Sequence, residues 1–525
     1  MDAFLYLGSR LADGELLYIK DFETKLPLLQ YLFFFAHKLG GIGAWRIITL
    51  LFSLFFSAAA AKIYVSDHPS EPHALNHDDK SAIVFLTGVF LLILYSLPGS
   101  ESAEIEMIPA ASMFLAFAMA TSNGAMMSTF KIPFICGILT AFSASIRPNY
   151  IYVTISFILI FLLSLRESGL DLATPTKKDF SFLFGFSGFI FLSFSPYLFV
   201  NHGIPSLIDG LKAIARFPMH INALQLILAQ SSPPTEIFYI GVYSGTIILL
   251  LKIITNRNDS SLKKRDFNRI LFCCTSLIFL NMSFISSHYY SHYSMMLVPF
   301  AMPIVFYSYK NIPKIGLIIK SHSELNIRGT ILKTLVLISF FSLLILPAKS
   351  LFKNVNNIDF SNKNAFFSIN HRNTDDNLLR LLAGLKSQGV SFFVSDNPIY
   401  HALLNQPRLG DGHPSMLKDV LKGRKIGPID NIYLYSDEVH KNPCLALFNS
   451  QKDVILTSAN HELDKLITSC LSSEKSPYVR SNFISLSAKS SEINGKNLRK
   501  YRFFIRKDRI NAIAGDTTKF APVVQ

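Results

Sequence analysis

The sequence predicts a polytopic α-helical membrane protein with a small α/β domain near its C-terminal end. Half of the 525 residues are hydrophobic and only 16% are charged, whereas soluble proteins carry about 25% charged residues. Long apolar stretches fill the first two thirds of the chain, and the last third alternates short helical and strand patterns. These observations favour about ten membrane spans followed by a water-exposed domain.

The apolar stretches recur at intervals that suit successive membrane helices. A span needs about 20 residues, with a tolerated range of about 17–25. The candidate spans are 43–65, 82–98, 107–122, 131–146, 149–165, 180–201, 235–255, 269–287, 293–308 and 333–349. The stretch 26–39 is too short to cross, and Pro27 can open a helix, so we expect an interfacial helix there.

Basic residues in the loops indicate which ends of the spans face the cytoplasm. With residues 1–42 placed outside, the loops assigned to the inside carry more lysine and arginine than the outer ones, as cytoplasmic loops do. The net charge of +14 therefore reflects membrane orientation rather than nucleic-acid binding. The same alternation places 350–525 outside. It also places the candidate site residues named below on the outer face, as an active site at a membrane surface requires.

We expect three regions: a multispan membrane domain over 1–349, an α/β domain over 350–510 and a tail over 511–525. The second region carries helical patterns at 375–385 and 460–471 and strand patterns at 390–394, 431–435, 453–457 and 501–505. Cys444 and Cys470 lie in it. They could pair in an oxidising compartment, although two cysteines define no disulfide framework.

The first 27 residues combine acidic and basic side chains ahead of the first candidate span. The pattern consists of Asp2, Gly14, Tyr18, Asp21, Glu23, Lys25 and Pro27. It resembles the first exoplasmic loop of the GT-C glycosyltransferases, the polyprenyl-phosphate-sugar enzymes that include protein mannosyltransferases and the aminoarabinose transferases of lipid A. Leu26 replaces the first of the two prolines in the family pattern. The family's first transmembrane helix would precede Asp2, so we expect either an upstream start or a shortened relative.

The resemblance implies transfer of a sugar from a polyprenyl-phosphate donor to an exoplasmic acceptor, with inversion at the sugar. Such a displacement needs one positioned base. The resemblance favours Asp2 for this role, followed by Glu23 and Glu104, with Asp21 and Glu106 as further carboxylates. Lys25 is expected to face the lipid phosphate. These carboxylates permit a divalent metal without requiring one.

Further phosphate-binding candidates lie beyond this loop. Arg147 interrupts two apolar runs, where an ionisable group is a functional hypothesis by default, and its guanidinium can clamp a phosphate. His292 and Tyr293 match the late His-Tyr pair of the family, and His288 lies four positions earlier. The structural alternatives are an arginine that snorkels at a turn and tyrosines of an aromatic belt.

The resemblance also implies a location and partners. We expect a multi-pass protein of the cell inner membrane with its C-terminal domain on the periplasmic side. Its partners would be a polyprenyl-phosphate-linked sugar and a lipid, glycan or protein acceptor. An O-antigen polymerase or ligase is the alternative enzyme, and a transporter or flippase is the alternative of another class. The sequence shows no internal repeat and no pair of Gly/Pro-broken helices in corresponding halves, which are the features that would favour a transporter.

Overall fold

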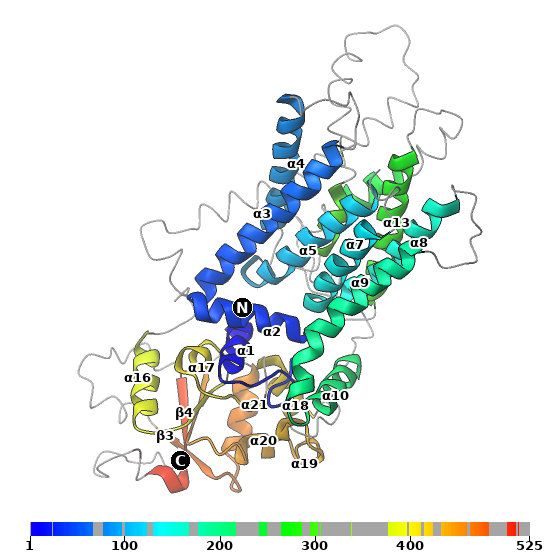
Figure 1. Cartoon of the computed structure of the whole chain (residues 1–525). Helices are drawn as coiled ribbons and strands as arrows, with labels where there is room; N and C mark the ends of the chain where they lie inside the picture. The colour runs from blue at the N-terminus through cyan, green and yellow to red at the C-terminus, as the bar shows by residue number, and fades with distance from the viewer. Residues whose placement is uncertain are drawn as a thin grey trace. The chain divides into compact units, whose positions relative to one another are not determined.

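The computed structural model is drawn in Figure 1 and divides into two compact units. The mixed unit comprises 1–45, 194–218 and 361–525, and the helical unit comprises 46–193 and 219–360. The structure describes residues 2–23, 25–66, 77–96, 100–122, 130–166, 177–216, 241–248, 264–285, 295–302, 305, 338, 376–395, 398–410, 414–423, 432–458, 462–481, 501–510 and 513. The described chain is mostly helical with one small sheet, which confirms the predicted combination of elements.

Long apolar helices form the helical unit. They are α3 (Ile42–Ser66), which starts in the mixed unit, α4 (His77–Ser96), α5 (Ser100–Ala120), α7 (Lys131–Ile146), α8 (Val153–Arg166), α9 (Lys177–Phe194) and α13 (Lys264–Ile285). Glycines bring α7 and α9 together, because a Cβ on Gly137 would lie 2.2 Å from the carbonyl oxygen of Phe182. Small residues at helix contacts are typical of helices that pack in membranes.

Two described helices are long and apolar enough to cross a membrane, Ile42–Ser66 and Lys177–Phe199. Both expose several leucine and phenylalanine side chains, among them Leu51, Phe55, Phe184 and Phe191. A large apolar surface is unfavourable in water, so these helices indicate membrane association. Shorter apolar helices occupy other predicted spans, at 80–95, 105–120, 131–146, 148–159 and 270–280. Of the predicted spans 235–255, 293–308 and 333–349, the structure describes only 241–248, 295–302, 305 and 338.

The sheet of the mixed unit has the order β1-β2-β4-β3. Its strands are β1 (Phe392–Val394), β2 (Val454–Ser458), β3 (Tyr478–Ser481) and β4 (Tyr501–Arg506). β1 runs parallel to β2, with Phe393 opposite Ile455, and the other pairs are antiparallel. Short helices surround it, namely α16 (Asp376–Ser387), α17 (Ile399–Leu404), α18 (Pro414–Leu421), α19 (Asp437–Lys441), α20 (Leu445–Phe448) and α21 (Glu462–Leu471).

Most elements predicted for this region are confirmed. The strands at 390–394, 453–457 and 501–505 correspond to β1, β2 and β4, and the two helices correspond to α16 and α21. The strand predicted at 431–435 is wrong, because Tyr433–Tyr435 forms a short 3₁₀ helix. Its buried side chains pack inside the unit, where the Tyr435 ring lies 5.3 Å from that of Phe22, so their burial does not come from strand pairing. The sequence also missed β3. Cys444 and Cys470 form a disulfide that joins the start of α20 to α21.

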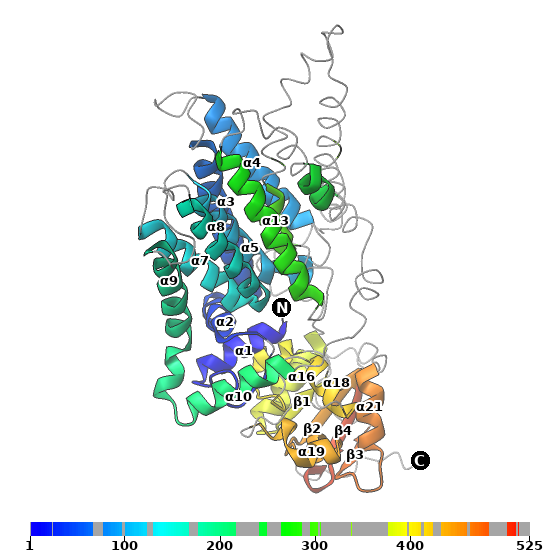
Figure 2. The same cartoon turned by 90° about the vertical axis from the view of Figure 1, so that its right-hand side faces the viewer.

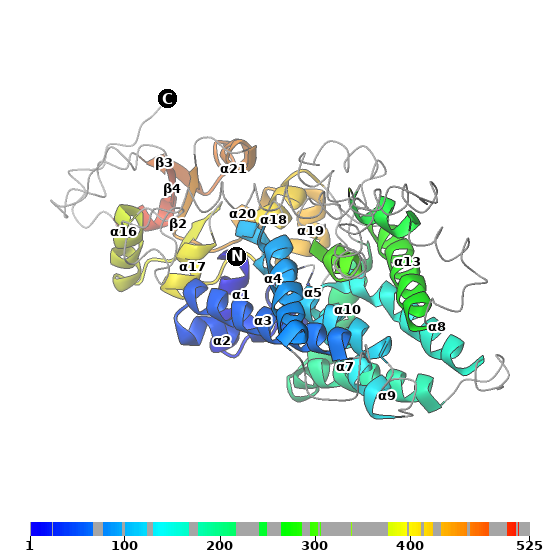
Figure 3. The same cartoon turned by 90° about the horizontal axis from the view of Figure 1, so that it is seen from above.

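The N-terminal segment, predicted as an exoplasmic loop, contains two helices. α1 (Asp2–Ala12) was not anticipated, whereas α2 (Pro27–Leu39) confirms the helix expected at 26–39. The two pack at very short range, since a Cβ on Gly8 would lie 2.4 Å from the backbone of Phe33. α1 also packs against α17, as Figure 3 shows. The N-terminal segment therefore belongs to the same compact unit as the C-terminal region.

Candidate active site in the N-terminal loop

The acidic loop, residues 13–23, follows α1 and is fixed by a buried tyrosine. The Tyr6 hydroxyl donates to the two carboxylate oxygens of Asp21 at 3.0 and 3.1 Å, and it accepts the backbone N–H of Arg408 at 2.9 Å. Burial raises the pKa of Tyr6 well above its ordinary value, and the charge of Asp21 adds to this effect. The phenol therefore stays protonated and remains a donor to Asp21 at physiological pH.

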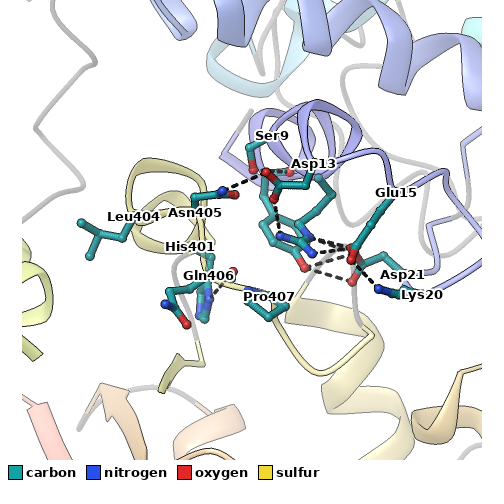
Figure 4. A network of polar contacts seen from close by, with 12 residues as sticks. Ser9, Asp13, Glu15, Lys20, Asp21, His401, Leu404, Asn405, Gln406 and Pro407 are labelled. Atoms are coloured by element: carbon teal, nitrogen blue, oxygen red, sulfur yellow. Dashed lines mark hydrogen bonds and ion pairs between the residues drawn. The ribbon is translucent and has the colours of Figure 1, made fainter. Parts of the chain in front are cut away.

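A second cluster neutralises the outer carboxylates of the acidic loop. The Arg10 guanidinium binds Glu15 through Nε at 2.9 Å and Asp13 through Nη1 at 2.7 Å, and its Nε lies 4.0 Å from Asp21. Lys20 donates to the other oxygen of Glu15 at 2.6 Å. Figure 4 shows this network beside 404–407. Charge-assisted bonds of this kind fix the loop in one conformation.

The amide of Gln30 on α2 ties the acidic loop to both N-terminal helices. Its oxygen accepts the N–H of Leu17 at 2.8 Å, and its nitrogen donates to the carbonyls of Leu7 and Glu15 at 3.1 and 3.0 Å. From a distant part of the chain, Tyr197 donates its hydroxyl to the Leu17 carbonyl at 2.7 Å. Backbone groups in the buried part of this loop are thus satisfied by side chains, as burial requires.

The C-terminal region supplies the surface on which the acidic loop lies. The N–H of Phe22 donates to the Gly410 carbonyl at 3.1 Å, and Asn405 donates to Asp13 at 2.9 Å. Gly410 has a φ of +93°, and a Cβ there would lie 2.5 Å from Ile432 and 3.2 Å from the Lys20 carbonyl. Only glycine allows this close approach.

Glu23 and Lys25 lie at the end of the acidic loop, next to Tyr18. Tyr18 adopts a φ of +67°, which is uncommon for a bulky residue, and its hydroxyl donates to the Lys25 carbonyl. Burial raises the pKa of Tyr18 well above its usual range, and the charge of Glu23 raises it further. The Glu23 side chain is only 3% exposed. Because burying a carboxylate is costly, this placement marks Glu23 as a functional candidate.

In the helical unit, the structure joins two residues that were predicted to act separately. Arg147, at the end of α7, forms an ion pair with Glu106 of α5. The exposed fractions of the two side chains are 4% and 0%. Nearby, the buried Tyr150 hydroxyl donates to the Met296 carbonyl at 3.3 Å. The positive charge of Arg147 is therefore compensated by a carboxylate instead of being presented to a phosphate.

Asp21, Glu23 and Lys25 thus follow one another in one segment, in which Asp21 contacts Tyr6 and the Lys25 carbonyl accepts the Tyr18 hydroxyl. Asp2 is the first residue of α1, and Glu104 lies within α5, but both side chains fall outside the described set. His288, His292 and Tyr293 also lie outside the described residues. Among the described residues, no group of three or more His, Cys, Asp or Glu side chains could hold a metal ion.

Several residues of the site were not predicted from the sequence, namely Tyr6, Arg10, Gln30 and Arg408. The spacing of Tyr6 and Arg10 on one helical face is a signal that could have found them. Arg408 contacts Tyr6 across 402 positions, and no local pattern carries that information. No family model, curated protein or solved structure matches this chain.

Proposed function

We propose that this protein is a membrane glycosyltransferase of the GT-C type. It would move a sugar from a polyprenyl-phosphate donor to an exoplasmic acceptor with inversion. The observation that carries this proposal is the burial of two nearby carboxylates, Asp21 and Glu23, in a segment that Tyr6 links to Arg408 of the C-terminal region. Asp and Glu side chains are rarely buried in proteins, which is why the burial of these two supports a functional site.

In the proposed mechanism one carboxylate removes the proton of the acceptor hydroxyl. The acceptor oxygen then forms a new bond to the anomeric carbon of the sugar while the sugar–phosphate bond breaks and the lipid phosphate leaves. Asp2 and Glu23 are the candidates for this base, and Glu104 follows them. Asp21 would position the loop, because the Tyr6 hydroxyl holds it. Lys25 would neutralise charge that develops on the departing phosphate. Arg147 would bind phosphate only after release from Glu106, so we assign it a lesser part than the sequence suggested.

The proposed setting is the cell inner membrane, with about ten spans and the mixed unit on the periplasmic face. Two supports for this placement are the apolar helices Ile42–Ser66 and Lys177–Phe199 and the disulfide between Cys444 and Cys470. Disulfides persist in oxidising compartments and are rare in the cytosol. The disulfide therefore favours the outer face for the region that holds the acidic loop.

The test is a transfer assay on the full-length protein in proteoliposomes. Undecaprenyl-phosphate-linked hexoses and pentoses would be supplied as donors together with cell-envelope lipids, glycans and proteins as acceptors, and both release of the lipid phosphate and transfer of the sugar to an acceptor would be measured. A positioned base contributes about 10²–10⁴-fold, so we expect a loss of this size in either Asp2→Asn or Glu23→Gln and a milder loss in Glu104→Gln. Lys25→Ala should slow release of the lipid phosphate.

The matched control is Glu438→Gln, which changes an exposed carboxylate on α19. This variant should turn over at the parent rate. If Asp2→Asn and Glu23→Gln also keep the parent rate, the base does not lie in the N-terminal segment. If the parent consumes no donor of this class, the proposed activity is wrong.

A transporter is the second candidate, and the Glu106–Arg147 pair is the observation that favours it. Buried ionisable side chains between apolar helices often mark pathways for ions or substrates. The same proteoliposomes separate the two functions. A transporter would move the lipid-linked sugar between leaflets without releasing lipid phosphate, whereas a transferase would release it.

A further inference from the structure

The apolar side of helix α10 (Gly203–Arg216) has two adjacent parts, an inner face that is buried and an outer face that is exposed. The inner face carries Leu207, Gly210 and Ala213, which are buried in the mixed unit. Gly210 lies so near the Tyr18 ring that a Cβ there would be 2.4 Å from it, and Figure 2 shows α10 beside the N-terminal segment. The outer face carries Ile204 and Ile208, which are 38% and 45% exposed.

The outer face has the spacing of a membrane-binding helix. Ile204, Ile208 and Leu211 follow one another at i, i+4 and i+7, so they form one stripe. Lys212 lies at the edge of the stripe, exposes its ammonium group and pairs with Asp209 at 3.2 Å. A lysine in this place can lay its aliphatic stem on an apolar surface and keep its charge among lipid headgroups.

The chain that leads into α10 limits where this stripe can lie. The candidate span Lys177–Phe199 ends in a 3₁₀ helix, and Phe199 at its end is 85% exposed. Gly203 begins α10 four positions later. Four residues reach about 14 Å at most, so the start of α10 stays close to the level at which the span leaves the membrane.

A second helix shows the same combination of exposure and short connection. α2 exposes Phe35 and Leu39, and α3, the other candidate span, begins at Ile42. Lys38 lies 5.9 Å from the centre of the Phe34 ring. In both helices, exposed apolar side chains therefore lie within a few residues of a span.

We propose that α10 is an interfacial membrane helix whose outer face, with Phe199, inserts into the boundary between lipid headgroups and acyl chains. The partner is the lipid bilayer, and continuity with the span Lys177–Phe199 is the reason for this choice. Because Gly210 contacts Tyr18, this insertion sets the depth of the acidic loop relative to the membrane. The inference rests on membrane association and is independent of the proposed activity.

Depth-dependent fluorescence quenching tests the proposal on the full-length protein. The parent contains a single tryptophan, the buried Trp45. Its fluorescence is the same background signal in every variant and can be subtracted. Ile208→Trp would be reconstituted into phosphatidylcholine bilayers with and without dibrominated acyl chains. Side chains of interfacial helices lie about 5–10 Å below the headgroup boundary, so the added signal should fall at least about twofold in the brominated bilayer.

Glu438→Trp on α19 is the control at an exposed polar position, and its added signal should change little. Ile204→Trp is the second variant in case Ile208→Trp does not fold, and it should be quenched to a similar degree. The proposal is overturned if both variants lose no more signal than the control. Loss of quenching together with a dimer in solution would also overturn it and assign the face to a second copy of the chain.

Discussion

The Glu106–Arg147 ion pair places two full charges among apolar helices with almost no exposure. Removing such charges from water costs several kcal/mol per ion, and the opposite partner offsets that cost only while both are present. The pair connects the start of α5 to the end of α7, so it fixes the relative position of these helices. At the scale of single residues, each charge therefore offsets the free-energy cost of burying the other.

A double-mutant cycle measures this dependence. Glu106→Gln or Arg147→Gln alone should lower the free energy of unfolding by about 3–5 kcal/mol, because each leaves one buried charge without its opposite. The double variant should be closer to the parent than either single variant, since no buried charge is left without compensation. Thermal unfolding in detergent gives the comparison. Additive losses in the double variant would contradict a direct coupling between the two side chains.

At the scale of elements, the segment from α17 to Gly410 supports the acidic loop through a buried histidine. The Nε2 atom of His401 accepts the N–H of Val394 at 3.0 Å, so Nδ1 carries the proton and donates to the Gln406 carbonyl at 3.1 Å. Arg408 donates to the carbonyls of Val394 and Ser395 and lies over the Phe393 ring. Neutral His401 thus connects β1 to the segment that contacts Tyr6.

This arrangement predicts a loss of stability in mild acid. Burial lowers the pKa of His401 well below its ordinary value, and the charges of Arg408 and Lys452 lower it further. The unfolded chain binds a proton near pH 6.5 and the folded chain does not. Below that pH the free energy of unfolding should therefore fall by about 1.4 kcal/mol per pH unit, until the folded pKa is reached.

Unfolding measured at pH 7.5 and 5.5 tests this expectation. In His401→Gln the free energy of unfolding should differ much less between the two pH values than in the parent, although it should be lower than the parent's at both. His440→Gln, which changes a partly buried histidine on α19, is the control and should keep the parent's pH dependence. Equal pH dependence in all three proteins would show that His401 does not titrate as described.

Three helices, α7, α2 and α1, show what sequence patterns can and cannot predict. α7 was predicted at its observed bounds, because Lys131 and Arg147 border a mostly apolar run. The helix at 26–39 was predicted from Pro27 at its start and from an apolar run too short to cross a membrane. α1 was missed because Asp2–Ala12 is short and carries charges, so its buried face depends on partners from α2 and α17. The pairing of Tyr6 with Arg408 and of Glu106 with Arg147 depends on tertiary packing and has no local signal.

At the scale of the whole molecule, both ends of the chain build one compact unit. The disulfide between Cys444 and Cys470 lies in this unit and joins positions 26 residues apart. A loop of this length predicts about 3–4 kcal/mol of stabilisation in the chain-entropy view of disulfides. This stabilisation is available only where the compartment allows the bond to form.

Disulfide formation in cells therefore reports the location of the mixed unit. In a bacterial host we expect Cys444 and Cys470 to resist alkylation until a reductant is added, and to become reactive when periplasmic thiol oxidation is disabled. Cys444→Ala/Cys470→Ala should show no such change, since the other three cysteines lie outside this unit. Reporter fusions after Lys263 and within 360–500 should indicate the cytoplasm and the periplasm, respectively. A cytoplasmic signal from both fusions would contradict the proposed orientation.

The contact between Tyr6 and Arg408 also sets an order of events during biosynthesis. The two residues are 402 positions apart, and ribosomes add about 5–20 residues per second, so the Tyr6 hydroxyl waits roughly 20–80 s for its partner. During this interval the acidic loop lacks the surface formed by 398–410. Until then Asp13 also lacks Asn405, and Phe22 lacks the Gly410 carbonyl. The described conformation of the acidic loop is therefore complete only in a chain that has been synthesised beyond residue 410.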